Sequence, residues 1–274
     1  MPVSAMKTPA RSLLFVPANR AERIVKAQRA GAHAVIVDLE DAVAPAEKEA
    51  ARAALAKHLD AAAPVLVRVN GPETQWFASD IELCAQPGVA GVLVPKAEDV
   101  MQLHVTRQCV GKDKALFPLI ETARGFDHAR ALAECGLAQR LTFGHIDFQL
   151  DLGIEGEQDE LLYFRSQLVL VSRLAGLPAP IDGVSVAIED TERVRAETMY
   201  CKRLGFGGKL CIHPKQVPVV NACFVPSAEE QAWAQRVLDA AHASQGSAIA
   251  VDGKMIDVPV IRKAEEILAA VSAS

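Results

Sequence analysis

The chain has 274 residues, half of them hydrophobic, which is enough for one large α/β domain with a sizeable core. Its formal net charge is −5, and its 29 basic and 34 acidic residues are mixed along the length without a basic tract, which argues against nucleic-acid binding. No apolar run approaches the roughly 20 residues of a membrane span, and residues 1–10 lack the apolar core of a signal peptide. Six cysteines without a CxxC pair indicate reduced thiols, so we expect a cytoplasmic protein without membrane or nucleic-acid partners.

Eight strand-like runs recur along the chain, with helical patterns between them. Their apolar content is nearly continuous, which is typical of parallel strands that are covered on both faces. The runs are 12–17, 34–40, 65–70, 91–96, 115–122, 141–147, 181–188 and 209–213. Eight such alternations predict an α/β fold, a closed (β/α)₈ TIM barrel. An open doubly wound sheet is the alternative, although no G-x-G-x-x-G follows the first run.

Amphipathic patterns predict the helices, and the last of them lie beyond what a barrel needs. The helical stretches include 20–29, 47–59, 127–132 and 161–174. A further helix begins at Ser227, where Ser-Ala-Glu-Glu is an N-cap pattern, and a final helix covers 258–270. We therefore assign 1–222 to a catalytic barrel and 223–274 to a C-terminal helical extension. This extension is expected to pack as an arm on its own barrel or on a neighbouring subunit.

Polar residues close several predicted strands, and in such barrels these strand ends form the site. Glu121 closes the fifth strand and Asp147 the sixth. Two carboxylates so placed predict a site for a hard divalent cation, unless they form salt bridges with arginines. Arg68 ends the third strand between two valines, and its guanidinium needs an anion, either a substrate group or Glu40.

Other strand ends also carry polar residues with two interpretations each. Asp38, Glu40 and Asp41 follow the second strand, where they either begin the next helix or support the site from behind. Lys96 closes the fourth strand. It is either a plain cation for a carboxylate or phosphate, or a Schiff-base nucleophile if its pKa is lowered. His145 is either a turn residue or a substrate contact.

Taken together, the strand ends and the C-terminal segment form a recognisable set of motifs. The motifs are RSLLFVP (11–17), DLEDAV (38–43), RVN (68–70), VPK (94–96), PLIET (118–122), FGHIDF (143–148) and DGKMIDVP (252–259). The set resembles the citrate lyase β-subunit family of the HpcH/HpaI aldolase superfamily, of the malyl-CoA or citramalyl-CoA lyase type. The resemblance implies a TIM barrel, a Mg²⁺ cofactor and a homotrimer or dimer of trimers. It also implies a carbon–carbon lyase that converts a β-hydroxyacyl thioester into a 2-keto acid and an acyl thioester, or the reverse.

The resemblance also assigns roles to individual residues. The metal ligands it implies are Glu121 and Asp147, and the catalytic residues are Arg68 and Asp257. Asp257 is expected to reach the site of a neighbouring subunit on the C-terminal arm. The expected contacts to substrate or CoA are Phe15, Arg20, Arg68 and Lys96.

Three other functions stay open at this point. The chain could be the β subunit of a citrate lyase complex, acting on a citryl thioester of an acyl-carrier protein. It could be a Schiff-base aldolase that uses Lys96. It could also be a non-catalytic binding protein on the same barrel, although the complete set Arg68, Glu121 and Asp147 argues against that.

Overall fold

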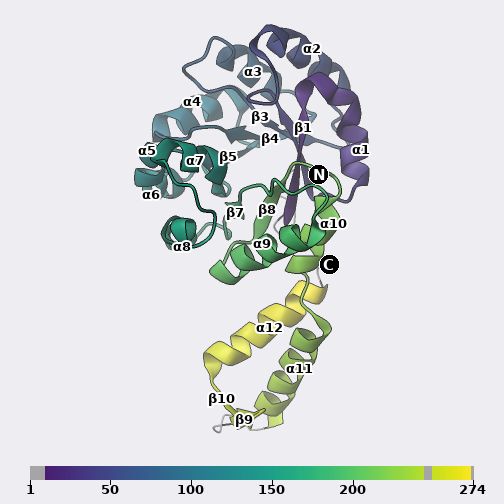
Figure 1. Cartoon of the computed structure of the whole chain (residues 1–274), viewed down its shortest axis with the longest axis vertical. Helices are drawn as coiled ribbons and strands as arrows, with labels where there is room; N and C mark the ends of the chain where they lie inside the picture. The colour runs from purple at the N-terminus through teal and green to yellow at the C-terminus, as the bar shows by residue number, and fades with distance from the viewer. Residues whose placement is uncertain (1–9, 244–248, 273–274) are drawn as a thin grey trace. The chain divides into compact units, whose positions relative to one another are not determined.

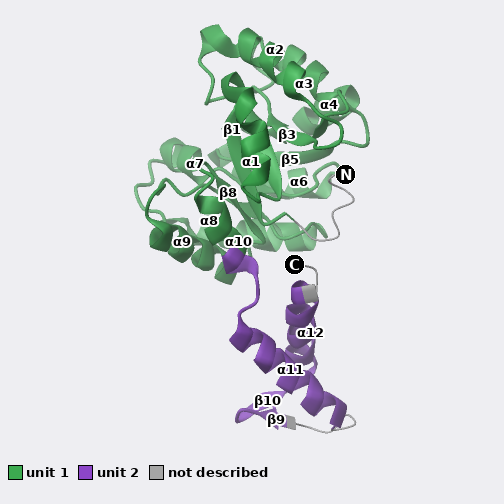
Figure 2. Cartoon of the chain, turned by 90° about the vertical axis from the view of Figure 1, so that its right-hand side faces the viewer, with its two compact units in different colours: residues 1–221 green, residues 222–274 purple. Residues whose placement is uncertain are grey.

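The computed structural model describes residues 10–243 and 249–272 (Figure 1). The chain divides into two compact units, Met1–Asn221 and Ala222–Ser274 (Figure 2). Strands with helices around them make up the first unit, and the second unit consists of helices and a two-stranded antiparallel sheet. The division lies one residue before the boundary predicted from the sequence.

Eight parallel strands form the first unit. They are β1 (Ser12–Pro17), β2 (Ala34–Asp38), β3 (Val65–Arg68), β4 (Val89–Val94), β5 (Ala115–Ile120), β6 (Thr142–Phe143), β7 (Ile181–Asp182) and β8 (Gly208–Cys211). Each strand pairs with the next along the chain, and β8 pairs with β1, with Ser12 opposite Lys209. This closure confirms the predicted (β/α)₈ TIM barrel and rules out the open sheet.

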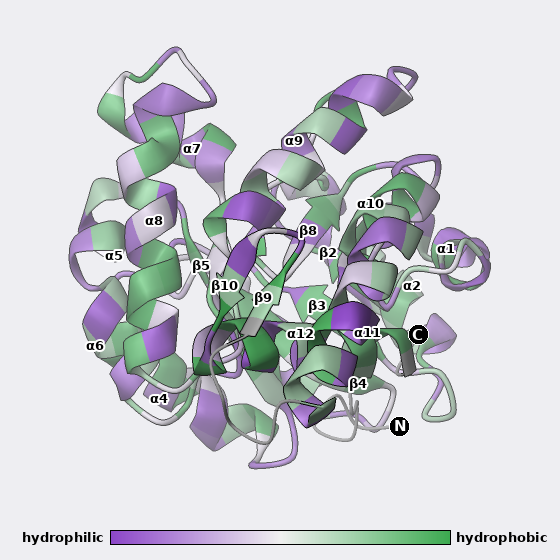
Figure 3. Cartoon of the chain, turned by 90° about the horizontal axis from the view of Figure 1, so that it is seen from below, coloured by the Kyte–Doolittle hydropathy of each residue, from purple (hydrophilic) through white to green (hydrophobic). Residues whose placement is uncertain are grey.

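Helices surround the barrel and carry hydrophilic and hydrophobic residues in alternation along their length (Figure 3). They are η2 (Ala18–Arg23), α1 (Ile24–Arg29), η3 (Pro45–Glu47), α2 (Lys48–His58), α3 (Phe77–Cys84), α4 (Val100–Val110), α5 (Ala123–Asp127), α6 (Ala129–Glu134), α7 (His145–Leu152), α8 (Asp159–Leu174), α9 (Thr191–Leu204) and α10 (Gln216–Phe224). The helix predicted over 127–132 is wrong in its start, because α5 ends at Asp127 and α6 begins at Ala129. Among the described residues, no helix combines the length and the apolar character that crossing a membrane requires.

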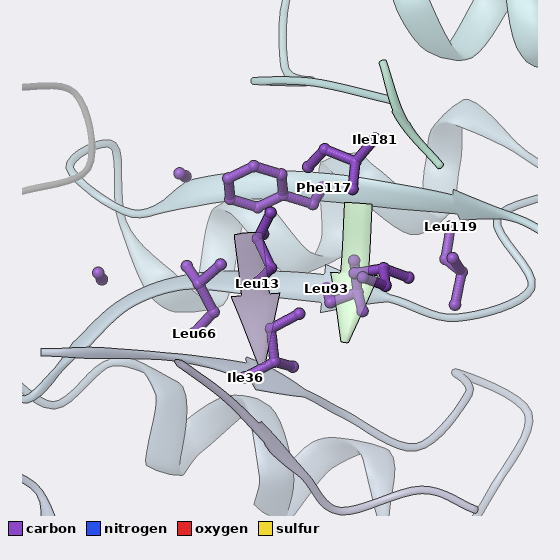
Figure 4. Close-up of a cluster of buried hydrophobic side chains, with 10 residues drawn as sticks. Leu13, Ile36, Leu66, Leu93, Phe117, Leu119 and Ile181 are labelled. Atoms are coloured by element: carbon purple, nitrogen blue, oxygen red, sulfur yellow. The ribbon is translucent and has the colours of Figure 1, made fainter. Parts of the chain in front are cut away.

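Side chains from the strands fill the barrel interior (Figure 4). The buried cluster there includes Leu13, Ile36, Leu66, Leu93, Phe117, Ile181 and Leu210. The intervening strand residues, such as Val37 and Leu116, are buried as well. Burial on both faces explains the continuous apolar runs in the sequence. Each large side chain buried in this way contributes about 1.5–3 kcal/mol of hydrophobic stabilisation.

The sixth and seventh strands are shorter than the sequence predicts, with two residues each. Gly144 follows the sixth strand and is the residue from which α7 begins. Gly183 follows the seventh, and the chain then continues without regular structure. Apolar residues in this loop, Val186 and Ile188, extend the strand-like pattern of the sequence, but both side chains are exposed.

The C-terminal unit has a small core of its own. Its elements are α11 (Ala228–Ala243), the antiparallel strands β9 (Ile249–Val251) and β10 (Lys254–Ile256), and α12 (Val258–Ser272). The buried residues of its core are Ala234, Val237, Ile256 and Ala264. The backbone N–H of Glu230 donates to Ser227 Oγ (3.1 Å), and that of Ser227 donates to Glu230 Oε2 (2.7 Å). These reciprocal bonds confirm the predicted N-cap at Ser227.

Candidate active site

The carboxyl ends of the barrel strands surround a cavity of about 560 Å³. Its lining residues come from β1, β2, β3, β5, β6, β7 and β8 or from the segments that follow them. Four of the seven residues to which the resemblance assigns a role lie in this wall together: Phe15, Arg68, Glu121 and Asp147. Because sites of TIM barrels lie at this end of the strands, we call this space the catalytic cavity.

Glu121 follows β5 directly, and only 1% of it is exposed. Its Oε1 accepts a hydrogen bond of 2.7 Å from the backbone N–H of Lys96. Its Oε2 is buried and has no partner among the described residues. Burial and then the negative charge of Glu40 raise the pKa of Glu121 from 4.5 to about 8. A carboxyl group in this state is one that a nearby cation would stabilise in its ionised form.

Asp147 lies in the first turn of α7 and not at the end of a strand, which corrects the prediction from the sequence. Gly144 precedes this helix, and a Cβ atom there would lie 2.6 Å from Oε2 of Glu121. Glycine therefore allows the start of α7 to approach that carboxyl group. Asp147 is half-buried in the cavity wall, and burial followed by the charge of Asp41 raises its pKa. The charge of Asp147 in turn contributes to the raised pKa of Glu121.

Arg68 is a fixed cation in the cavity wall. Its Nε donates to Asp38 Oδ1 (2.8 Å) and its Nη2 donates to Asp38 Oδ2 (2.6 Å). Its Nη1 lies 3.1 Å from Glu40 Oε2 and 3.4 Å from Asp41 Oδ2. Burial lowers the pKa of Arg68, but the hydrogen bonds and charge of Asp38 outweigh it and raise the pKa overall. The ring of Phe15 lies 5.1 Å from the guanidinium carbon, at the distance of a cation–π contact.

Besides Glu40, which the sequence indicated, Arg68 has a second and closer partner in Asp38. Asp38 also accepts hydrogen bonds from the backbone N–H groups of Glu40 (2.9 Å) and Ala42 (3.2 Å). Helix α2 begins only at Lys48, so the acids after β2 do not start that helix. The pairing of Asp38 with Arg68 could have been predicted from the sequence, because both residues end neighbouring parallel strands. In the structure they lie opposite each other in register.

Lys96 follows β4 with a φ of 42°, a left-handed conformation that is uncommon for a residue other than glycine. In this conformation its N–H donates to Glu121, while its Nζ donates to Glu40 Oε1 (3.0 Å). Burial lowers the pKa of Lys96, but the charge and hydrogen bond of Glu40 raise it above its ordinary value. A Schiff-base nucleophile requires a lowered pKa. The surroundings of Lys96 therefore suit a plain cation.

Lys96 is not among the residues that line the catalytic cavity, and two further residues with an assigned role belong to other parts of the chain. Arg20 is exposed on η2, and its Nε donates to Glu22 Oε1 (2.8 Å). It is not among the residues that line the catalytic cavity. Asp257 belongs to the C-terminal unit, where its Oδ1 accepts a hydrogen bond of 3.2 Å from the backbone N–H of Val260 at the start of α12. The expected roles of both residues stay predictions.

His145 opens α7 and is buried in the wall of the catalytic cavity, with 5% exposed. Its ring stands over Gly183, where a Cβ atom would lie 2.1 Å from Nδ1. This Nδ1 has no hydrogen-bond partner within the described part of the chain. Burial lowers the pKa of His145 to about 4, so the ring is neutral near pH 7. The imidazole is thus part of the cavity wall and not of an exposed turn.

Known proteins of similar sequence cover nearly the whole chain. The profile of the HpcH/HpaI aldolase/citrate lyase family matches residues 11–214, which include every cavity residue described above. A citrate lyase subunit beta-like protein of Deinococcus radiodurans is 38% identical over 275 residues, covering 94% of this chain and 96% of that protein. A (3S)-malyl-CoA thioesterase of Cereibacter sphaeroides is 35% identical over 271 residues, covering 95% of this chain and 94% of that protein.

Solved structures agree with the sequence comparison. The crystal structure of CitE from Mycobacterium tuberculosis in complex with magnesium, acetoacetate and coenzyme A matches with a TM-score of 0.85 and 36% identity. The match covers 96% of this chain and 98% of that chain. These agreements confirm the resemblance that the strand-end motifs indicate. The chain therefore belongs to the HpcH/HpaI aldolase/citrate lyase family, a family of carbon–carbon lyases.

Proposed function

We propose that the protein is a Mg²⁺-dependent lyase that cleaves or forms a β-hydroxyacyl thioester such as citramalyl-CoA, malyl-CoA or citryl-CoA. The products of cleavage by this retro-aldol or Claisen route are a 2-keto acid and an acyl thioester. The observation that carries the proposal is the pair of acids Glu121 and Asp147, which face one cavity together with Arg68. Two relatives support it: CitE of M. tuberculosis was solved with magnesium and coenzyme A, and the C. sphaeroides relative is named for malyl-CoA.

The two acids suit Mg²⁺, which binds through one or two protein carboxylates and takes its remaining ligands from water and substrate. Among the described residues, no group of three or more histidine, cysteine or acidic side chains is arranged around one metal position. A cage made of protein ligands alone therefore does not fit, whereas an open two-carboxylate site does. Oε2 of Glu121, buried without a partner among these residues, is the atom most in need of a cation. Mg²⁺ bound there would polarise the oxygen that becomes the keto-acid carbonyl.

Arg68 is positioned to stabilise the charge that develops during cleavage. The hydroxyl proton of the substrate goes to a base, the C–C bond breaks, and its electron pair forms a thioester enolate. The enolate oxygen is negative and is stabilised by a cation that is already in place. Arg68 meets this requirement because Asp38 holds its guanidinium through two hydrogen bonds. Lys96 supplies a further positive charge for a substrate carboxylate.

The coenzyme end of the thioester has a matching space beside the catalytic cavity. A second cavity of about 290 Å³ shares Phe15, Pro17 and Ile212 with the catalytic cavity. Its other lining residues include Arg23 and Lys26, whose cationic side chains suit the phosphates of CoA. Arg20 lies in the same segment, η2, and we propose that it contacts the coenzyme at the exposed rim.

The C-terminal unit has a separate role in the proposal. Asp257 would protonate the enolate carbon in the site of a neighbouring copy, within a homotrimer or a dimer of trimers. This part rests on the resemblance of residues 252–259 to a C-terminal motif of the family and on the compactness of the unit, which has its own small core. Five cysteines, Cys84, Cys109, Cys135, Cys201 and Cys211, are free thiols, which supports a reducing compartment and hence the cytoplasm.

The proposal is tested with a panel of CoA thioesters in the presence of Mg²⁺, with products identified by mass. We expect a 2-keto acid and an acyl-CoA, loss of activity on treatment with EDTA, and recovery on addition of Mg²⁺. Cleavage at the full rate after EDTA treatment would show that the metal assignment is wrong. Release of free CoA with an intact β-hydroxy acid would instead show the hydrolysis for which the C. sphaeroides relative is named.

Two alternatives are decided by companion assays. A subunit of a citrate lyase complex should act on a citryl thioester of the acyl-carrier protein and leave the CoA esters untouched. A Schiff-base aldolase should form an adduct on Lys96 when it is incubated with a keto acid and borohydride. The raised pKa of Lys96 leads us to expect no such adduct.

A further inference from the structure

Behind His145 lies a cavity of about 210 Å³ that the proposed mechanism does not use. Its lining comes from the end of β7, from β8, from α8 and α9, and from the segment before α8. Helices α8 and α9 flank this side of the barrel (Figure 1). Two residues, His145 and Val184, line both this rear cavity and the catalytic cavity. They are therefore the partition between the two spaces.

The rear cavity contains a buried cluster of two cations and one anion. Arg165 Nε donates to Asp182 Oδ1 (3.0 Å), and Lys209 Nζ donates to Asp182 Oδ2 (2.9 Å). No more than 5% of any of these three side chains is exposed. An arginine has five N–H donors and a lysine has three, so the two cations can serve a further acceptor besides Asp182. This cluster is cationic by one charge.

The outer end of the rear cavity has the opposite balance. There the exposed Arg193 donates to Glu157 (3.2 Å) and to Glu197 (2.8 Å), so one cation faces two acids. The excess positive charge is thus confined to the buried cluster.

The fold keeps His145 in its place as a partition. The ring fits over Gly183, because any Cβ there would lie 2.1 Å from Nδ1. The ring of Phe143 lies 6.3 Å from the imidazole on the strand that leads into α7. On its catalytic side the cavity wall contains four acidic residues and Arg68, so a second substrate carboxylate would meet an excess of acidic groups and no free cation among the described residues of the wall. Burying such a carboxylate without a partner is unfavourable.

We propose that His145 is the residue that selects the keto acid: it admits keto acids with a single carboxylate and separates a second carboxylate from the cationic cluster of Arg165 and Lys209. This inference rests on the proposed function and narrows its substrate class. Thioesters whose cleavage yields a keto acid of the pyruvate or glyoxylate type are then substrates, whereas those yielding oxaloacetate are disfavoured. Such selectivity arises because a ligand with a second carboxylate would have to bury that charge without a partner, which weakens its binding.

The test compares binding of two keto acids of similar shape by calorimetry in the presence of Mg²⁺. Oxaloacetate ends in a carboxylate, and 4-methyl-2-oxopentanoate carries an uncharged isopropyl group in its place. Pyruvate serves as the reference ligand. In His145→Ala, affinity for oxaloacetate relative to the uncharged analogue should rise roughly tenfold or more, the factor expected for one added hydrogen bond to a charged group. His145→Phe refills the wall and should reverse the shift.

A second substitution separates charge from space. In the double variant His145→Ala/Lys209→Met, the gain for oxaloacetate should fall, while affinity for the uncharged analogue should stay as in His145→Ala. Val184→Ala opens the same partition and should shift the ratio in the same direction, even if His145→Ala does not fold. Thermal unfolding establishes that each variant is folded.

Several outcomes would overturn the inference. One is a ratio within about twofold of the wild type in both partition variants. Another is an equal gain for both ligands, and a third is a gain for oxaloacetate that survives Lys209→Met. A wild type that binds pyruvate but cleaves no thioester would refute the proposed lyase reaction and leave the binding ratio as a separate test of His145. Absence of any keto-acid binding by the wild type would overturn both.

Discussion

Replacing Glu121 by glutamine should stabilise the metal-free protein at alkaline pH. The pKa of Glu121 is about 8 in the folded protein and 4.5 ordinarily, because burial and Glu40 disfavour the charged form. Between these pH values the unfolded chain has lost a proton that the folded protein retains, so the free energy of unfolding falls as the pH rises. The stability that depends on the protonated state of Glu121 is fully present below pH 4.5 and is lost by about pH 8. At about 1.4 kcal/mol per pH unit, the loss amounts to about 5 kcal/mol.

The assay is urea denaturation of the wild type and Glu121→Gln in EDTA, from pH 5 to pH 9. The amide oxygen of glutamine can still accept the hydrogen bond that Lys96 N–H donates to Oε1, so the local structure is preserved. The two proteins should have similar stability near pH 5. The variant should be more stable at pH 8, by up to about 5 kcal/mol. Parallel stability curves across this range would refute the reasoning, because they would mean that Glu121 does not titrate between pH 5 and pH 8.

Added Mg²⁺ should reverse the order of the two proteins. Binding to the wild type displaces the proton of Glu121, so the stabilisation by Mg²⁺ should increase as the pH rises from 5 to 8. The variant lacks one of the two proposed ligands and should gain little. Equal stabilisation of both proteins by Mg²⁺ would place the metal elsewhere.

Three further substitutions test the surroundings of the site. Gly144→Ala places a Cβ atom 2.6 Å from Oε2 of Glu121 and should displace that ligand. We expect Mg²⁺ binding, measured by calorimetry, to weaken about tenfold. Unchanged affinity would mean that the Cβ atom does not displace Glu121. Asp38→Asn removes the charge paired with the buried Arg68 and should lower the free energy of unfolding by about 3 kcal/mol in urea denaturation. A loss below about 1 kcal/mol would mean that the other nearby acids hold the guanidinium. Asp257→Asn retains the N-cap of α12, whereas Asp257→Ala loses it and should lower the free energy of unfolding by about 1 kcal/mol. Turnover should fall about 10²- to 10⁴-fold in both variants. Wild-type turnover in the asparagine variant would remove Asp257 from the mechanism.

Parts of the site were predictable because they follow from local patterns. The apolar run of β5 ends at Glu121, and a run that ends at an acid indicates a strand delivering that acid to the end of the barrel. The same reasoning placed Asp147 wrongly, at the end of a strand. The residues around Gly144 form a short apolar run, and periodicity does not distinguish a strand from the start of a buried helix over such a length.

The sequence by itself determined the fold class, since eight continuous apolar runs alternating with amphipathic helices indicate a parallel α/β sheet that is covered on both faces. The choice of a closed barrel over an open sheet became certain only through the pairing of β8 with β1. It also determined the family, because the motifs lie at the strand ends where a barrel places its chemistry. Only the tertiary structure decided which charges meet. Asp38 and Arg68 are 30 residues apart, and their pairing follows from the register of β2 and β3. The raised pKa of Lys96 and the place of His145 between two cavities likewise depend on burial and on partners from distant segments, which no local pattern encodes.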